Sequence, residues 1–161
     1  MTTKIAVRKR LIVAASVIAA VLMPLVSTDA RSADAKMPTA KIGNHLIKLE
    51  VASSEAEIEK GLMFRTSMPE DQGMVFLFHP PRKVRFWMCH TLIPLDMMFI
   101  DKGKIVKISH DAKPCKSENC TDCDMFPSDS AIYATHVIEV NGGYTERHSI
   151  KEGDTVDMEL R

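Results

Sequence analysis

The sequence predicts an all-β domain with only minor, short helices, arranged as an antiparallel sandwich or barrel. Two observations predict this class. Roughly seven or eight short apolar or alternating segments follow one another with turn residues between them, which is typical of antiparallel β folds. These segments do not alternate with long helical patterns, as the strands of a parallel α/β sheet would.

The N-terminal segment is typical of a secretory signal peptide. Basic side chains within residues 4–10 precede the uncharged run Leu11–Val26, and residues 33–35 offer the small-x-small pattern that signal peptidase cleaves. The alternative is a retained membrane anchor. A spanning helix needs about 20 apolar residues, however, and this run is shorter and contains Pro24. We expect residues 1–35 to be removed, which leaves one domain, 36–161, without a stable membrane span, in the periplasm or outside the cell.

The charge balance argues against nucleic-acid binding. Residues 1–35 carry five of the 21 basic and two of the 21 acidic side chains, so the mature part keeps 16 basic and 19 acidic side chains and a net charge of about −3. Nucleic-acid-binding proteins present a basic surface, whereas a mildly negative, mixed surface is typical of soluble proteins in general. We therefore expect no nucleic-acid partner.

The mature part begins with a β-hairpin and a short helix. Gly43-Asn44 is a two-residue turn signal, and the alternating run His45–Val51 follows it. A capping box at Ser54 predicts a helix over Glu55–Lys60, which ends at Gly61.

The remaining elements are strands separated by turns. Pro80-Pro81 interrupts the apolar pattern after the run Met74–Phe78. Asp111–Ser130 is a polar loop that holds three cysteines. A helical turn is expected at Thr145–His148. The strands are predicted over Met74–Phe78, Val84–Met88, Leu95–Ile100, Ile105–Ile108, Ile132–Val140 and Thr155–Leu160.

Several motifs of the mature part resemble the domain-of-unknown-function 192 family. They are Gly61-Leu62-Met63-Phe64-Arg65, Gly73-Met74-Val75-Phe76, Phe86-Trp87-Met88, Thr91-Leu92-Ile93-Pro94-Leu95-Asp96, Pro114-Cys115 with Cys120, Val137-Ile138-Glu139 and Gly153-Asp154. The resemblance implies a compact, jelly-roll-like β-sandwich that is often exported, and it implies no activity, substrate or cofactor. The chain departs from the family pattern at Cys89-His90, where the family usually has Lys-Asn, and Cys123 is an addition to the usual pair.

All four cysteines lie in the part expected to be exported: Cys89, Cys115, Cys120 and Cys123. Because exported compartments are usually oxidising, structural disulfides are the first interpretation. One arrangement joins Cys115 to Cys120 and Cys89 to Cys123, but the sequence leaves all three connectivities open. The alternatives are a metal site on the three cysteines of the loop and a redox-active Cys120-x-x-Cys123 pair.

Met88-Cys89-His90 is a candidate copper site. The three side chains offer a thioether, a thiolate and an imidazole, all of which suit copper. If the segment is a strand, Met88 and His90 share a face and Cys89 points away from them. The alternative is that the methionines fill the core, since Met adapts to irregular gaps.

A second candidate site is a ligand pocket formed by polar and aromatic residues that stand beside apolar motif positions. Its candidates are Arg65, Trp87, Thr91, Asp96 and Glu139. Convergent polar groups with an aromatic wall are typical of small-molecule sites. A carboxylate that faces the core needs a partner, and Arg65 is a candidate partner for Asp96 or Glu139. The alternative is that both acids face solvent.

The residues favour a binding or accessory module of the cell envelope over an enzyme, since neither Gly-x-Ser-x-Gly nor His-Glu-x-x-His occurs in the sequence. The expected partner is a small molecule, a glycan or an envelope protein. Two further hypotheses are a periplasmic copper-binding protein that uses Met88, Cys89 and His90, and an unidentified enzyme that uses Arg65, Asp96 and Glu139.

Overall fold

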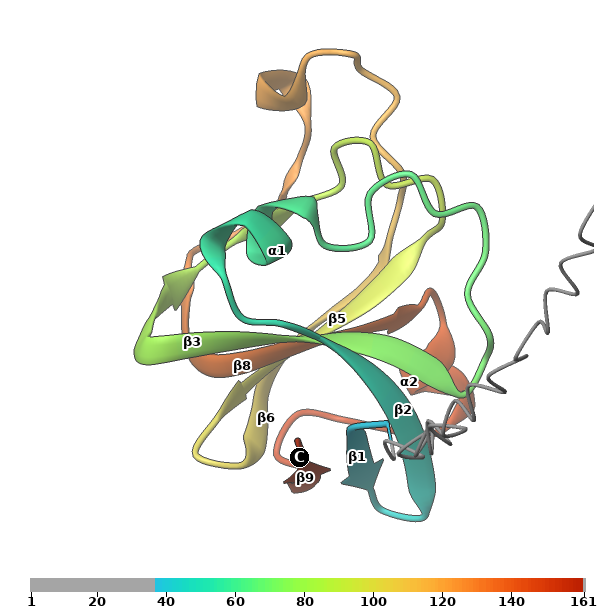
Figure 1. The fold of residues 1–161 in the computed structure, drawn as a ribbon, viewed down its shortest axis with the longest axis vertical. Helices are drawn as coiled ribbons and strands as arrows, with labels where there is room; N and C mark the ends of the chain where they lie inside the picture. Colours follow the sequence, from blue (N-terminus) through green and yellow to red (C-terminus); the bar gives the residue numbers. More distant parts are fainter. Residues whose placement is uncertain (1–36, 161) are drawn as a thin grey trace, which may run out of the picture. The chain divides into compact units, whose positions relative to one another are not determined.

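The computed structural model describes residues 37–160, which form a mostly β domain with short helices (Figure 1). The expected signal peptide, residues 1–35, lies outside the described residues. No helix within 37–160 has the length and apolar character needed to cross a membrane. The elements are β1 Thr39–Ile42, β2 His45–Ala52, α1 Glu55–Lys60, β3 Gln72–Val84, β4 Phe86–Trp87, β5 Leu95–Asp101, β6 Lys104–Ala112, the 3-10 helix η1 Cys120–Asp122, β7 Met125–Phe126, β8 Ile132–Asn141, α2 Tyr144–Arg147 and β9 Val156–Glu159.

Seven strands form one sheet in the order β6-β5-β8-β3-β2-β1-β9, which curls into a half-barrel, and β4 pairs with β7 in a separate small sheet. The predicted β class is confirmed. The sheet is mixed, however, because β2 and β3 run parallel, so the architecture differs from an antiparallel, jelly-roll-like sandwich. The connection over residues 53–71 contains α1, and it is long enough to carry the chain back to the end of the sheet where β2 began, as a parallel pair requires.

The predicted hairpin and helix are both confirmed. β1 and β2 pair from Thr39 with Lys48 to Ile42 with His45, across a turn in which Gly43 has a φ of 57°. The Ser54 hydroxyl accepts from the backbone N–H of Glu57, and the Glu57 carboxylate accepts from the backbone N–H of Ser54. This capping box satisfies donors that the first turn of the helix would otherwise leave free.

The double proline does not end the third strand. β3 continues through Pro80-Pro81 to Val84, and its pairing with β8 shifts register between Leu77 and Arg82. Because proline lacks the N–H that a regular ladder uses, the irregularity falls where the two prolines stand. The strand predicted over Val84–Met88 is therefore divided between the end of β3 and the short β4.

The two edge strands of the sheet meet at one corner of the half-barrel. Lys104 at the start of β6 forms an isolated antiparallel bridge with Thr155, next to β9. Backbone hydrogen bonds also run from Ile105 N–H to Asp154 O at 3.0 Å and from Val156 N–H to Gly103 O at 2.9 Å. The corner therefore joins the two ends of the strand order.

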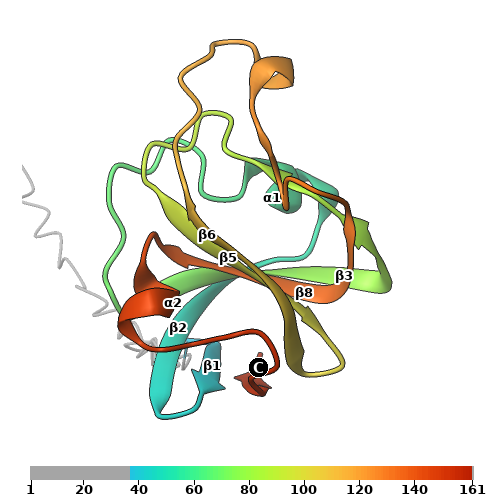
Figure 2. The same cartoon turned by 180° about the vertical axis from the view of Figure 1, so that it is seen from behind.

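The sheet is buried on both sides at β5. Side chains alternate along a strand, so Met97 and Phe99 pack on the side that α1 covers, whereas Met98 and Ile100 pack on the side that α2 covers. α1 lies nearer the viewer in Figure 1, and α2 lies nearer in Figure 2. We call these two sides the α1 face and the α2 face. Burial on both faces explains why β5 is apolar from Leu95 to Ile100 except at Asp96.

Candidate functional site

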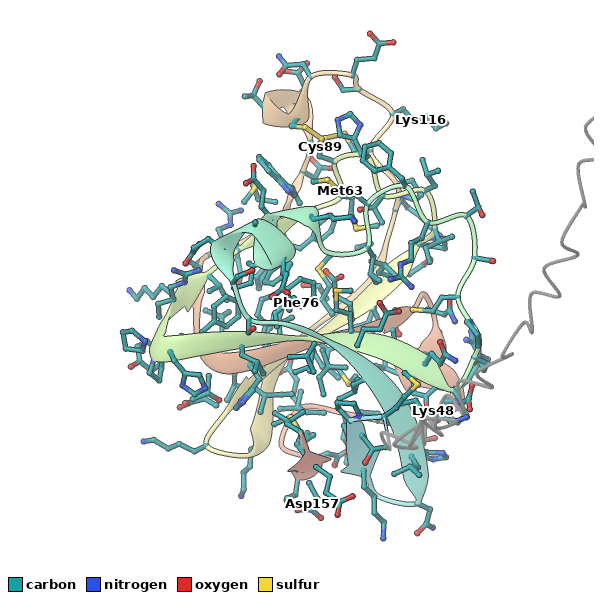
Figure 3. The ribbon with its side chains drawn as sticks, in the orientation of Figure 1. Lys48, Met63, Phe76, Cys89, Lys116 and Asp157 are labelled. Atoms are coloured by element: carbon teal, nitrogen blue, oxygen red, sulfur yellow. A yellow bond between two sulfur atoms is a disulfide. The ribbon has the colours of Figure 1, made fainter. Side chains whose placement is uncertain are left out.

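A cleft of about 510 Å³ lies on the α1 face. One wall comes from α1 and the residues that follow it, and another comes from β3 and β4. Thr91, Met125 and Glu139 complete the lining. Figure 3 shows Phe76 beneath α1, at the inner wall. The cleft is therefore assembled from segments that are far apart in the sequence.

Glu139 places a carboxyl group in this cleft. It follows Ile138 on β8, and strand alternation sets it on the α1 face with Val137. Only 4% of its surface is exposed, and its side chain makes no hydrogen bond or ion pair with any other residue of 37–160. Burial raises the pKa of Glu139 to about 8, so the carboxyl is mostly protonated at neutral pH. A neutral carboxyl offers one O–H donor as well as acceptor oxygens.

Aromatic rings form the apolar part of the cleft. Phe86 meets Phe76 edge to face, with ring centroids 4.9 Å apart, so the two rings hold each other in place. Gly61, at the end of α1, lies against Phe76, and a Cβ at this position would stand 3.1 Å from the ring. Trp87 is 37% exposed, which places a large ring between the cleft and solvent.

Thr91 adds a hydroxyl to the lining. It is buried, and its hydroxyl donates to the backbone oxygen of Cys89 at 3.4 Å. Three of the five pocket candidates from the sequence, Trp87, Thr91 and Glu139, thus line one cleft.

Both signs of charge occur at the rim of the cleft. Arg82 pairs with Glu55 through two hydrogen bonds of 2.9 and 3.3 Å, and its guanidinium lies 5.2 Å from the centre of the Phe78 ring. The hydrogen bond from Arg82 and its positive charge lower the pKa of Glu55. Arg85 donates to the backbone oxygens of Pro127 and Ser128. Arg82 and Arg85 are thus engaged by the protein itself.

Arg65 does not pair with Asp96 or Glu139. Both of its terminal nitrogens donate to the Glu50 carboxylate, at 2.6 and 2.5 Å. The hydrogen bond with Glu50 raises the pKa of Arg65. Glu50 stands on β2, and the pair is half-buried, so it fastens the segment after α1 to the sheet.

Asp96 is buried on the α2 face. Its carboxylate accepts from the backbone N–H groups of Asp111, Gly143 and Thr145, at 2.7, 2.9 and 2.8 Å, and from the Thr145 hydroxyl at 2.6 Å. Burial alone would raise the pKa of Asp96, but these donors outweigh burial and lower the pKa. Asp96 therefore ties the start of α2 and the end of β6 to β5.

The four cysteines form two disulfides, Cys89 with Cys120 and Cys115 with Cys123. This is one of the three connectivities that the sequence left open, and it differs from the example of Cys115 with Cys120. Cys120 and Cys123 are bonded to different partners, so they do not form a disulfide with each other. Figure 3 places Cys89 at the base of the loop that carries η1.

The candidate copper ligands are separated by their environments. Met88 is 1% exposed and belongs to the core of the α1 face, as core filler would. Cys89 is in a disulfide, and His90 stacks on Phe64 with ring centroids 5.1 Å apart. β4 ends at Trp87, and His90 has a φ of 53°, so this segment is a turn and strand alternation does not apply to it.

Sequence reasoning did not single out the contribution of α1 and β3 to the cleft. Gly61 and Phe76 stand within the family motifs and line the cleft. In the sequence, however, Gly61 is equally consistent with a helix end, and Phe76 with a core position of a strand. The parallel pairing of β2 with β3 brings them together. No local pattern in the sequence predicts that pairing.

Comparisons with known proteins agree with this fold. The sequence pattern of the DUF192 family, described as Uncharacterized ACR, COG1430, matches residues 38–158. A comparison with curated proteins found no match. The structure of a protein of unknown function from Novosphingobium aromaticivorans DSM 12444 is similar, with a TM-score of 0.64 and 36% identity over 74% of this chain and 82% of that one. The structure of a proposed transcription regulator from Sinorhizobium meliloti 1021 is also similar, with a TM-score of 0.63 and 32% identity over 75% of this chain and 91% of that one. The chain therefore belongs to the DUF192 family.

Proposed function

We propose that this protein is an exported, non-enzymatic binding module of the cell envelope, and that a glycan occupies the cleft on the α1 face. The observation that carries the proposal is the Glu139 carboxyl, which lines the cleft, is 4% exposed and has no protein partner among residues 37–160, and whose pKa burial raises to about 8. The carboxyl oxygens are accessible from the cleft, so their hydrogen-bond partner must be water or a ligand there. A ligand that enters the cleft would take the place of water in that hydrogen bond.

The chemistry of the lining supports an uncharged polar ligand with one apolar face. A protonated carboxyl favours a hydroxyl or amide over a carboxylate, because it both donates and accepts. Trp87 and Phe86 offer apolar surface for the flat side of a sugar ring, and the arginines of the rim already have protein partners. A neutral sugar with an N-acetyl group combines the required hydroxyl, amide and apolar face.

An enzyme that uses Arg65, Asp96 and Glu139 is not supported by the geometry. Arg65 is held by Glu50, and Asp96 and Glu139 face opposite sides of the sheet. A role in transcription is not supported either. The proposed regulator from Sinorhizobium meliloti is similar in fold, but the net charge of about −3 in residues 36–161 does not favour nucleic-acid binding.

The test is a titration with N-acetylglucosamine and its short oligomers, followed by tryptophan fluorescence. Trp87 is the sole tryptophan of the chain, so any change in emission reports on this cleft. We expect a saturable change in the wild-type protein. Glu139→Leu should weaken binding at least tenfold, because it removes the hydrogen bond, whereas Glu139→Gln keeps a donor and an acceptor and should retain binding.

The matched control is Glu146→Gln, at an exposed position of α2 outside the cleft, which should leave the titration unchanged. The pH dependence adds an independent check. Affinity should fall above pH about 8, where the Glu139 carboxyl ionises, and this fall should be absent in Glu139→Gln. If a folded wild-type protein gives no saturable response to these sugars, glycan binding in the cleft is wrong.

A further inference from the structure

A second cluster of chemically active side chains lies outside the cleft. The sulfur atoms of Cys89 and Cys120 and a ring nitrogen of His90 all lie within 4.8 Å of one another. Cys89 is fully buried, whereas Cys120 and His90 are half-buried, so the cluster opens to solvent on one side. The His90 ring makes no hydrogen bond with any other residue in the described part of the chain.

We propose that Cys89, Cys120 and His90 form a metal site that is closed while the Cys89–Cys120 disulfide is intact and opens when a dithiol reduces it. Two thiolates and one imidazole are soft to borderline ligands, which suit Zn²⁺ or Cu⁺. Three protein ligands around a tetrahedral ion leave one position for water or another ligand. The set differs from Met88, Cys89 and His90, because Met88 is packed in the core.

The spacing of the three ligand atoms fits an ion. Metal–sulfur bonds of about 2.3 Å and metal–nitrogen bonds of about 2.0 Å place tetrahedral ligand atoms roughly 3.5–3.8 Å apart. The three atoms already lie within 4.8 Å of one another. Once the sulfur–sulfur bond is broken, the two sulfurs separate to this distance by side-chain rotation alone.

The second disulfide holds the site together after the first is reduced. Cys123, three residues after Cys120, is bonded to Cys115. The Cys115 N–H donates in turn to the backbone oxygen of Met88, next to Cys89. Cys120 therefore stays near Cys89. The entropic cost of bringing the ligands together is thus largely met before the metal binds.

His90 is also fixed in place from outside the site. Its backbone oxygen accepts from the Phe64 N–H at 2.8 Å, and its ring stacks on Phe64 at an interplanar angle of 18°. The left-handed backbone of His90 lets adjacent side chains turn toward the same point. Both features hold the imidazole beside the two sulfurs.

The redox step is a two-electron thiol–disulfide exchange. A dithiol attacks the half-buried Cys120 sulfur, the Cys89–Cys120 bond breaks, and the dithiol is oxidised to its own disulfide. Each cysteine sulfur takes up one proton in the overall exchange. Metal binding then displaces both thiol protons, because thiolates are the ligands.

The test measures metal binding to the oxidised and the reduced protein. Zn²⁺ and Cu⁺ are each titrated against a chromophoric chelator, before and after treatment with a dithiol, and mass spectrometry of alkylated peptides reports which disulfide has opened. We expect no competition for metal from the oxidised protein and one equivalent bound after reduction. The ion that the reduced protein withdraws from the chelator with the higher affinity is the preferred metal.

Variants separate this site from the remaining thiols. His90→Ala should weaken metal binding at least tenfold, and Cys89→Ser with Cys120→Ser should abolish it, although Cys115 and Cys123 remain. The matched control, His79→Ala, changes an exposed histidine outside the cluster and should have no effect. Equal binding by the oxidised and reduced wild-type proteins would overturn the proposal without any variant, and so would unchanged binding in His90→Ala.

Discussion

The carboxyl groups of Asp96 and Glu139 lie on opposite faces of one sheet, although they stand on neighbouring strands. β5 and β8 pair with Asp96 opposite Val140 and Met97 opposite Glu139. This offset of one residue sends Asp96 to the α2 face and Glu139 to the α1 face. Asp96 receives four hydrogen bonds, and Glu139 receives none from residues 37–160. The pKa of Asp96 is therefore lowered and that of Glu139 raised, so their contributions to stability depend on pH in opposite directions.

Glu139→Gln should stabilise the protein increasingly as pH rises. The folded pKa of about 8 lies above the unfolded pKa of about 4.3, so the folded state keeps a proton that the unfolded state has released. The wild type therefore loses stability from about pH 4 to about pH 8, by up to roughly 1.4 kcal/mol per pH unit. Urea unfolding of both proteins at about pH 5, 7 and 9 measures this difference. A constant difference across that range would contradict the raised pKa.

Asp96→Ala should destabilise the protein at neutral pH by about 3 kcal/mol, because it leaves the donors of Thr145, Gly143 and Asp111 without their acceptor. The pKa of Asp96 is lowered in the folded state, so its contribution is present above the unfolded pKa of about 3.9. That contribution disappears as pH falls through the lower folded pKa. Denaturant unfolding of both proteins at neutral and acidic pH measures the difference in unfolding free energy. A difference that grows as pH falls would contradict the lowered pKa of Asp96.

Gly61→Ala should weaken both the fold and the cleft. Gly61 has a φ of 40°, where a Cβ is strained, and the new methyl group would press on the Phe76 ring. We expect a loss of about 1–2 kcal/mol in unfolding free energy and a change in Trp87 emission. Gly153→Ala is the matched control, because Gly153 also has a positive φ but has open space around its Cβ position. It should show the loss of stability without the change in emission.

The two disulfides should contribute unequally to stability. Cys89–Cys120 spans 31 residues, and Cys115–Cys123 spans 8. In the loop-entropy relation they correspond to roughly 3.5 and roughly 2.5 kcal/mol. Thermal unfolding of the two paired Cys→Ser variants should give the lower midpoint when Cys89 and Cys120 are replaced. The reverse order would show that native contacts of the loop outweigh the chain entropy.

The local elements follow from the sequence because their determinants are neighbours along the chain. The turn at Gly43, the capping box at Ser54 and the largely apolar strand β5 all form as predicted. Sequence reasoning also named Trp87, Thr91 and Glu139 as pocket candidates, since polar and aromatic groups beside apolar motif positions are conspicuous.

The partners of those residues depend on long-range pairing, which local patterns do not specify. Arg65 pairs with Glu50 because the chain after α1 passes over β2. Asp96 and Glu139 separate because of a one-residue offset between strands. The disulfide connectivity likewise depends on how the loop that carries η1 folds back over Cys89, and four cysteines alone allow three answers.

The contact between Lys104 and Thr155 bears on how the protein behaves at high concentration. An exposed, flat sheet margin recruits strands from other molecules and seeds aggregates. Here the two edge strands of the sheet, β6 and β9, shield each other where they meet, and the backbone N–H groups of Ile105 and Val156 are already hydrogen-bonded there. The domain thus has less backbone available for intermolecular pairing, which favours a protein that remains dispersed in a crowded compartment.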